Sequence, residues 1–150
     1  MADIQIRRAA GRDLPQVLEM IHALAAHHGD TGTIDLDTLR RDALGDAPWI
    51  TLLLAETRGA LQGYTALCPL VQVQFGVRGM DMHHIYVTPQ MRGRGVGRAL
   101  IEAAQVEAKA QGCRYLMVGT QTGNTAAQSA YRAVGFEDAT PSGPRFRMKV

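Results

Sequence analysis

The chain has 150 residues, a length that fits one compact domain whose core needs no disulfide or metal to hold it. Apolar residues make up 46% and charged residues 20%, which is ordinary for a globular protein and argues against global disorder. The net charge of +2 is too small for general nucleic-acid affinity, and no apolar run approaches the roughly 20 residues of a membrane-spanning helix. Residues 2–8 are charged and alternating instead of forming a secretory signal, so we expect a cytoplasmic protein.

The cysteines and most histidines show no pattern of a metal site. Cys68 and Cys113 lie in strand-like stretches without CxxC spacing, which favours two buried free thiols in a reducing compartment. His22, His27 and His28 have no metal-ligand motif around them. We therefore expect neither a disulfide nor a bound metal.

Helical spacing dominates the first third of the chain. Residues 3–8 alternate and predict a short strand, after which Asp13 offers a helix cap and Gly29 ends that helix. A second, shorter helix is expected from near Asp35 to Gly45. The buried face expected for the first helix contains Leu14, Val17, Leu18, Ile21, Leu24 and Ala25.

The middle of the chain has the pattern of a strand meander. Residues 50–57 form a continuous apolar run, and the Arg58–Gly59 dipeptide predicts a tight turn into a second strand at 60–68. Residues 72–79 fit either an extension of this hairpin or a loop. A further strand is expected at residues 80–87, where Thr-Pro follows it.

Residues 95–111 give the clearest helical pattern in the sequence. Arg98 and Glu102 are spaced to form an exposed i,i+4 pair. The apolar stripe expected on this helix contains Val96, Ala99, Leu100, Ala103 and Val106.

Shorter elements are expected to complete the chain. Residues 115–119 predict a buried strand, and Asn124 caps a last helix that ends at Gly135. Phe136 and residues 145–150 are then expected to supply closing strands. This order predicts an α/β or α+β fold, organised as a single domain over residues 1–150.

Glycines and arginines gather in the loop between the strand at 80–87 and the helix at 95–111. Glycines let successive N–H groups approach a ligand without an intervening Cβ, and a helix start adds unpaired N–H donors and partial positive charge. Arg92, Arg94 and Arg98 strengthen this field. A diphosphate is therefore the ligand that we expect this loop to bind.

The spacing of this loop excludes two common nucleotide motifs. A P-loop requires a Lys-Ser/Thr pair after its last glycine, whereas Arg98 and Ala99 stand there. A dinucleotide fingerprint follows the first strand, and its third glycine, counted from Gly93, would fall at Arg98.

Two motifs resemble the GNAT superfamily of acetyl-CoA-dependent N-acetyltransferases. The family's pyrophosphate motif, Arg/Gln-x-x-Gly-x-Gly/Ala, stands here as residues 92–97, after a segment, 84–89, that looks like the family's fourth strand. Its second motif stands as Asn124-x-x-Ala127-x-x-x-Tyr131-x-x-x-Gly135-Phe136. The resemblance covers nearly the whole chain. It implies a mixed, mostly antiparallel central sheet of six to seven strands, flanked by about four helices.

The resemblance implies acetyl-CoA as the co-substrate. The last residues of the fourth strand would pair with the pantetheine amides, and the Val87 N–H would stabilise the oxyanion. The implied cofactor-binding residues are Ile85, Tyr86, Val87, Arg92, Gly93, Arg94, Gly95, Val96, Gly97, Arg98, Asn124, Ala127 and Tyr131.

Acetyl transfer to an amine also needs an acid and a base. The resemblance implies that Tyr131 donates a proton to the departing thiolate. Many family members carry a basic glutamate on the fourth strand, but here His83 and His84 occupy that stretch and Asp81 is the nearest carboxylate. Strand alternation predicts the two histidines on opposite faces, so at most one would face the active site. The base is therefore His83, His84 or a water.

The acceptor is less constrained than the donor. The first half vaguely resembles the spermidine/spermine and thialysine acetyltransferase branch, which implies a small primary amine such as a polyamine or amino acid. A protein N-terminus or lysine remains an alternative acceptor, and a CoA-binding regulatory module without catalysis is an alternative function. Many relatives pair through sheet edges or C-terminal strands, which makes a homodimer one expectation.

Overall fold

The computed structural model describes residues 3–141 and 143–150. The chain divides into two compact units, Met1–Gly119 and Thr120–Val150, and each is described by itself. The expectation of one domain over residues 1–150 stays a prediction. In the described ranges, no helix is long and apolar enough to cross a membrane.

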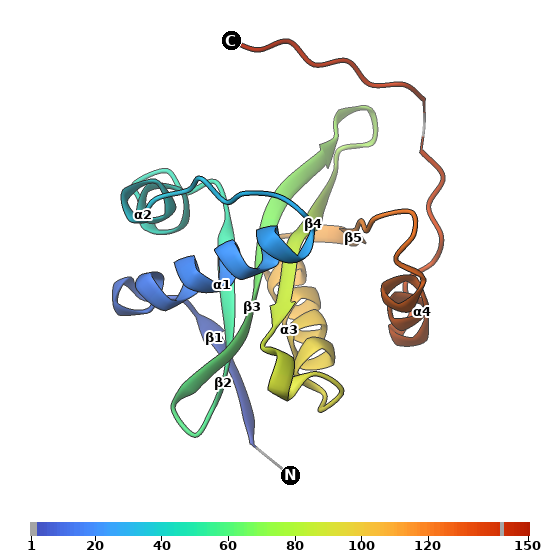
Figure 1. Ribbon diagram of the computed structural model, residues 1–150. Coiled ribbons are helices and arrows are strands. Elements are labelled where there is room, and N and C mark those ends of the chain that lie inside the picture. The colour runs from blue at the N-terminus through green and yellow to red at the C-terminus, as the bar shows by residue number, and fades with distance from the viewer. Residues whose placement is uncertain (1–2, 142) are drawn as a thin grey trace. The chain divides into compact units, whose positions relative to one another are not determined.

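The first unit is built on a five-stranded sheet in the order β1-β2-β3-β4-β5. The strands are β1 (Ile4–Arg8), β2 (Thr51–Thr57), β3 (Ala60–Gln72), β4 (Val77–Val87) and β5 (Cys113–Val118). Strands β1 to β4 pair antiparallel with their neighbours, and β5 joins β4 in parallel through the crossover helix α3 (Val96–Ala110). The mixed sheet is therefore confirmed, and Figure 1 shows β4 continuing past the end of β5.

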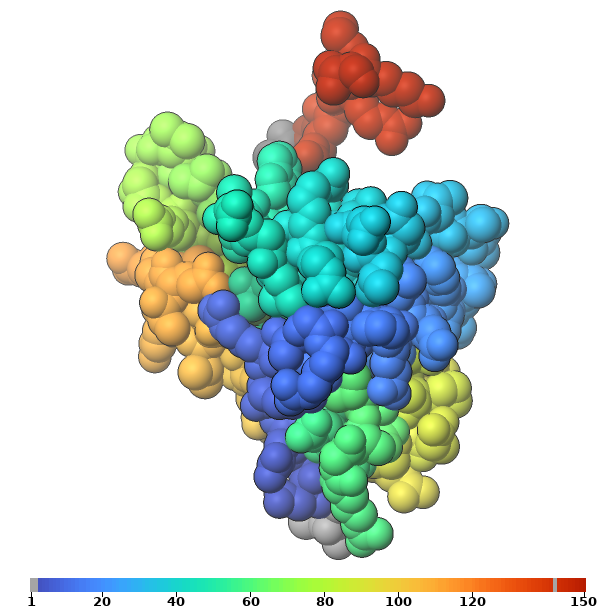
Figure 2. All heavy atoms as spheres, turned by 90° about the vertical axis from the view of Figure 1, so that its left-hand side faces the viewer, coloured from blue at the N-terminus to red at the C-terminus, as the bar shows by residue number. Residues whose placement is uncertain are grey.

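Helices cover both faces of this sheet. Helices α1 (Leu14–His27) and α2 (Leu36–Leu44) lie on one face, and α3 lies on the other (Figure 1). In Figure 2 the atoms of α1 and α2 form a continuous surface, beside which the end of the β3–β4 hairpin projects. The sequence predicted both helices of the first face with nearly these boundaries.

Among the described residues, alternation along the strands places buried side chains in a core on each face of the sheet. Each fully buried leucine or valine contributes about 1.5–3 kcal/mol to the stability of the fold. The core beneath α1 and α2 contains Leu14, Val17, Met20, Ile21, Leu24, Leu39, Leu52, Leu54, Leu61, Tyr64 and Ala66. The core beneath α3 contains Ala55, Met91, Val96 and Leu100, with Ile85 and Val87 packed against it.

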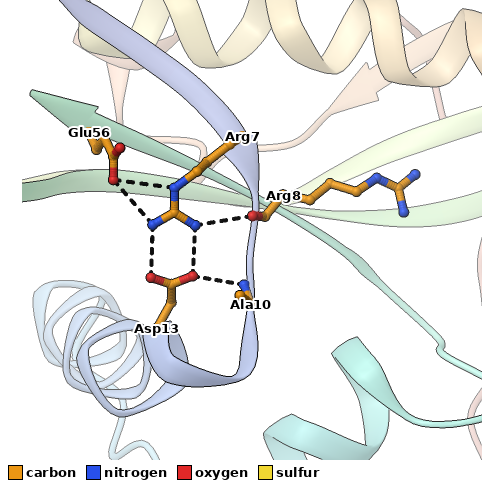
Figure 3. A network of polar contacts seen from close by, with 5 residues as sticks. All are labelled: Arg7, Arg8, Ala10, Asp13 and Glu56. Carbon is orange, nitrogen blue, oxygen red and sulfur yellow. Dashed lines mark hydrogen bonds and ion pairs between the residues drawn. The ribbon is translucent and has the colours of Figure 1, made fainter. Parts of the chain in front are cut away.

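Arg7 links β1 to β2 and to the start of α1 (Figure 3). Its Nη1 and Nη2 donate to Asp13 Oδ2 and Oδ1 at 2.7 and 2.9 Å, and its Nε donates to Glu56 Oε2 at 3.2 Å. Asp13 also accepts from the Ala10 N–H at 2.7 Å. Asp13 is the N-cap residue of α1, as the sequence predicted. Its side chain makes no capping hydrogen bond to α1, because the carboxylate accepts from Arg7 and from the Ala10 N–H instead.

Two turns of the meander contain left-handed backbone, the β2–β3 turn and the β3–β4 turn, where Gly76 has φ 63°. Arg58 (φ 52°) and Gly59 (φ 79°) form the tight β2–β3 turn that the sequence predicted. Residues 72–79, which fitted two interpretations, extend the next hairpin: β3 continues to Gln72, a 3-10 turn follows at Val73–Phe75, and β4 begins at Val77.

Among its described residues, the second unit contains one helix, α4 (Thr125–Val134). Its boundaries agree with the sequence, since Asn124 Oδ1 accepts from the Ala127 N–H at 3.1 Å and Gly135 ends it at φ 112°. The predicted closing strands at Phe136 and 145–150 are wrong, because residues 136–141 and 143–150 contain no strand. In the described part of the chain, the sheet thus has five strands instead of six to seven, while the four α-helices agree.

The apolar stripe predicted on α3 was partly wrong. Val96 and Leu100 are buried as expected, but Val106 is 70% exposed. Ile101, Ala104 and Ala108 complete the buried face instead. The buried face of α3 after Leu100 therefore differs from the predicted stripe.

Candidate active site

The Arg/Gly loop lies between the end of β4 and the start of α3, as the sequence predicted. A 3-10 turn at Pro89–Met91 follows β4, and its buried Met91 side chain anchors the loop to the core beneath α3. Gly93 and Gly95 then adopt left-handed backbone, with φ of 74° and 89°. Such angles cost a residue with a Cβ roughly 1–2 kcal/mol, so the turn into α3 depends on these glycines.

The backbone of this loop has free hydrogen-bond donors. Ala99 N–H donates to Gly95 O at 3.0 Å, which is the first helical bond of α3. Within the described residues, the N–H groups from Gly93 to Arg98 have no acceptor. A Cβ built at Gly93 or Gly95 would meet no atom within 4 Å, so the space above them is open. The loop therefore presents unpaired N–H donors and the positive end of α3 to an anion.

The three arginines of the loop differ in their surroundings. Arg92 Nε donates to the Val87 carbonyl at 3.1 Å, and its guanidinium lies 5.9 Å from the centroid of the Tyr86 ring. Arg98 pairs with Glu102 at 3.1 Å, which confirms the predicted i,i+4 pair. Arg94 is exposed and forms none of the ion pairs found among the described residues. Arg92 therefore braces the loop against β4, and Arg94 is the charge most available to a ligand.

Strand β4 has an open edge beside this loop. Strand β5 pairs only with Arg78–Met82, so residues 83–87 have no strand partner on that side within the described chain. Thr88 N–H donates to Gln62 O on β3 at 2.8 Å, so its backbone faces β3. Alternation then directs the backbone groups of Val87 and Ile85 to the open edge. Because the Val87 carbonyl already accepts a hydrogen bond from Arg92, the Val87 N–H is the free backbone group at this edge.

A β-bulge at His83 changes the direction of the β4 side chains. Ala66 pairs with His84 and Leu67 pairs with Met82, which leaves His83 as an extra residue on β4. The two imidazole rings stack at 4.6 Å with only 11° between their planes. The prediction that alternation separates the two histidines onto opposite faces is therefore wrong. The bulge brings them side by side.

His84 is held in the sheet by two hydroxyl groups. The Thr65 hydroxyl donates to the His84 carbonyl at 2.7 Å, and Tyr64 Oη lies 3.1 Å from His84 Nδ1. Burial lowers the pKa of His84 to about 4, with smaller contributions from the nearby His83 and His28. The ring is therefore neutral at pH 7 in the folded protein.

Asp81 and His28 lie close enough to the two histidines for their charges to interact. Burial raises the pKa of Asp81, and the charge of His83 opposes that rise. His22 Nε2 lies 3.0 Å from the Ile34 carbonyl, which ties α1 to the segment before α2. No group of three or more potential metal ligands occurs in the described residues. Tyr64 and Thr65 were missed from the sequence, although a tyrosine inside an apolar strand was a signal that its hydroxyl needs a polar partner.

The second unit holds the remaining site residues that the sequence predicted. Tyr131 and Ala127 lie one turn apart on α4, after Asn124. The Tyr131 ring meets the Phe136 ring edge to face, with centroids 5.8 Å apart. Burial raises the pKa of Tyr131, so its phenol keeps its proton at neutral pH. It is thus in the state that an acid requires.

Comparison with known proteins gives relatives over most of the chain. A thialysine N-epsilon-acetyltransferase from Bos taurus is 30% identical over 93% of this chain and 88% of its own length. An L-methionine sulfoximine/L-methionine sulfone acetyltransferase from Pseudomonas paraeruginosa is 30% identical over 88% of this chain and 79% of its own. The structure of the aminoglycoside N-acetyltransferase AAC(6')-Iy in complex with CoA matches with a TM-score of 0.79 at 23% identity, covering 100% of this chain and 97% of that one.

A family model also matches most of the chain, including both motifs. The model of the acetyltransferase (GNAT) family matches residues 17–136, which include the Arg/Gly loop and the motif on α4. The solved structure adds agreement in fold to this match. The chain therefore belongs to the GNAT family and is an acyltransferase enzyme.

Proposed function

We propose that this protein transfers an acetyl group from acetyl-CoA to the primary amine of a small molecule. The observation that carries the proposal is the loop at residues 93–98, with unpaired N–H groups at the start of α3, beside the open edge of β4. A diphosphate fits such a donor set, and an extended chain with amide groups fits such an edge. Coenzyme A carries both.

The binding roles follow from this arrangement. The loop N–H groups and Arg94 receive the pyrophosphate, and Arg92 keeps the loop in place through the Val87 carbonyl. Ile85 and Val87 offer their outward backbone groups to the pantetheine amides, and the Val87 N–H donates to the oxyanion. Asn124 and Ala127 form the N-terminal turn of α4, which carries Tyr131.

The reaction exchanges one bond at the acetyl carbon for another, with one proton leaving the amine and one reaching the sulfur. The neutral amine nitrogen attacks the thioester carbonyl, a C–N bond forms, and the C–S bond breaks. The amine loses a proton to a base at the His83–His84 pair or to water, and the departing sulfur takes a proton from the Tyr131 phenol. The products are the N-acetylated amine and CoA with a free thiol. Tyr131 regains its proton from solvent.

The relatives support a small amine as the acceptor. Their names include thialysine and methionine sulfoximine or sulfone, which are amino acids and their analogues. An amino acid or analogue is therefore our first choice of acceptor, and a polyamine is the second. Homodimer formation and a cytoplasmic location stay predictions.

A CoA-binding module without catalysis is the competing function, since β4 lacks the glutamate of many relatives. Release of free CoA thiol from acetyl-CoA, measured across a panel of amino acids, polyamines and aminoglycosides, separates the two. We expect thiol release that depends on the amine. Tight binding of acetyl-CoA without turnover on any amine would support the regulatory module instead.

The binding site itself is tested by Gly95→Val. A β-branched side chain cannot easily adopt φ 89° and would occupy the open space above the loop. We expect the affinity for acetyl-CoA, measured by calorimetry, to fall by at least about 100-fold. Gly112→Val is the matched control, because Gly112 has φ 79° and an equally open Cβ position at the other end of α3. Equal losses of affinity in both variants would mean that the loop is not the pyrophosphate site.

A further inference from the structure

The hydroxyl of Tyr64 is buried and has a single hydrogen-bond partner among the described residues. Its side chain is 0% exposed in the core beneath α1 and α2, so water does not reach the hydroxyl. Its Oη lies 3.1 Å from His84 Nδ1. Within the described residues, no other hydrogen-bond partner of this hydroxyl is present.

The direction of this hydrogen bond follows from the two groups. If His84 Nδ1 carried a proton and donated it, the Tyr64 O–H would be a buried donor without an acceptor, which is costly. If Tyr64 donates, every buried proton has a partner. Burial also raises the pKa of Tyr64, so the phenol is protonated and able to donate.

The tautomer of His84 is a consequence of that direction. A neutral imidazole carries one proton, and its two nitrogens are one donor and one acceptor. Since Nδ1 accepts from Tyr64, the proton lies on Nε2, on the side of the ring away from Tyr64. His84 in this state offers an N–H and has no free lone pair with which to take a proton from an amine.

We propose that Tyr64 is a positioning residue that fixes His84 as its Nε2–H tautomer, so that His84 donates a hydrogen bond to the acceptor substrate and His83 takes the proton of the amine. The second half of this inference rests on the proposed function. His83 is stacked on His84 and is exposed. The proton that leaves the ammonium therefore resides on His83 and passes from there to solvent.

The tautomer is tested on the wild-type protein without substrate. Nitrogen-15 NMR of histidine-labelled protein, assigned with a His84→Gln variant, distinguishes a protonated ring nitrogen from an unprotonated one. We expect a protonated Nε2 and an unprotonated Nδ1 at pH 7. In Tyr64→Phe, which keeps the ring volume, the Nδ1 resonance should move because its donor is lost. A wild-type His84 with its proton on Nδ1 overturns the inference.

The division of roles is tested by substitutions of similar size. In His84→Gln the amide nitrogen replaces Nε2 as a donor, whereas in His84→Asn the amide lies near the position of Nδ1. We expect kcat of His84→Gln to stay within about tenfold of wild type, the value of one hydrogen bond, and that of His84→Asn to fall further. His83→Gln, which cannot take a proton, should lose about 100-fold or more of kcat. Equal losses in the two His84 variants, or wild-type kcat in His83→Gln, overturn the assignment of roles.

The outcomes separate this inference from the proposed function. A protonated Nε2 in a protein that releases no CoA thiol with any amine leaves the role of Tyr64 intact and contradicts the acetyltransferase proposal. Amine-dependent thiol release together with a protonated Nδ1 supports the acetyltransferase proposal and contradicts the role of Tyr64.

Discussion

The guanidinium of Arg7 connects three segments of the first unit. Arg7 donates to Asp13 and Glu56, and Asp13 is only 7% exposed. The hydrogen bonds from Arg7 to Asp13 lower the pKa of Asp13 to about 2, with a further contribution from the Ala10 N–H. A buried carboxylate held in this way stabilises the fold because its charged form is bound better in the folded chain than in the unfolded one.

The variant Asp13→Asn tests the size and the pH dependence of that contribution. The folded pKa lies below the ordinary value, so the contribution is complete above about pH 4 and is lost as the pH falls through about 2. We expect Asp13→Asn to lower the free energy of unfolding by about 2 kcal/mol at pH 7, measured by urea denaturation. The difference from wild type should shrink between pH 4 and pH 2. A difference that is constant with pH would mean that the charge of Asp13 is not what stabilises the fold.

Glu56→Gln is the control for this pair. Glu56 accepts from the same guanidinium but lies on the more exposed side, at 20% against 7% for Asp13. Partly exposed ion pairs contribute less than about 1 kcal/mol. The loss of stability in Glu56→Gln should therefore be smaller than in Asp13→Asn.

The variant Tyr131→Phe tests whether Tyr131 is the acid that protonates the departing thiolate. Removing the Tyr131 hydroxyl keeps the ring against Phe136, so the helix and its packing should be unchanged. We expect kcat to fall by about 100-fold to 10,000-fold, with acetyl-CoA affinity within about twofold of wild type. Tyr115→Phe is the control, since this tyrosine lies on β5 against Gly79. Unchanged kcat in Tyr131→Phe would exclude the acid role.

The sequence was most informative where a residue type is required by local backbone. Glycines at 93 and 95 mark the loop because left-handed backbone needs them, and Asn124 marks the start of α4 because its side chain caps the helix. The stacking of His83 on His84 was not predictable, since it depends on a bulge that strand alternation does not reveal. Tyr64 was missed because its role depends on pairing with a strand 20 residues away.

The parallel pairing of β4 with β5 depends on a glycine. The Tyr115 ring lies over Gly79, its partner in the β4–β5 register, in the space that a Cβ would need. Gly79→Ala should cost about 1–3 kcal/mol of unfolding free energy, because the ring must move. In a Tyr115→Ala background the same change should cost less than about 0.5 kcal/mol, measured as a double-mutant cycle. An equal cost in both backgrounds would show that the ring does not press on Gly79.

Helical elements were predicted better than their buried faces. The boundaries of α1, α2, α3 and α4 agree with the sequence to within two residues, because caps and glycines mark them. The stripe on α3 diverged after Leu100, where alanines on several faces give the hydrophobic pattern little contrast. The length of the β3–β4 hairpin also could not be predicted. Residues 70–75 include the exposed Val71, Val73 and Phe75, so neither alternation nor burial marks the end of the strands.

The structure differs most from the sequence-based prediction in the number of strands. Residues 145–150 alternate basic and apolar side chains, Arg-Phe-Arg-Met-Lys-Val, which is the pattern of a strand with one buried face. In the structure this segment contains no strand, and Phe146 and Met148 are 95% and 85% exposed. Alternation can therefore describe a segment whose apolar face has nothing to pack against.

Removal of residues 142–150 distinguishes the two descriptions of this segment. A closing strand would bury Phe146, Met148 and Val150, and each such side chain contributes about 1.5–3 kcal/mol when fully buried. The structure leaves all three exposed, so their removal should change the free energy of unfolding by less than about 0.5 kcal/mol. Urea denaturation of the shortened chain at several protein concentrations measures this, since a contribution from a second copy would grow with concentration. A loss of several kcal/mol that is independent of concentration would mean that the segment packs within its own chain, as the alternation predicted.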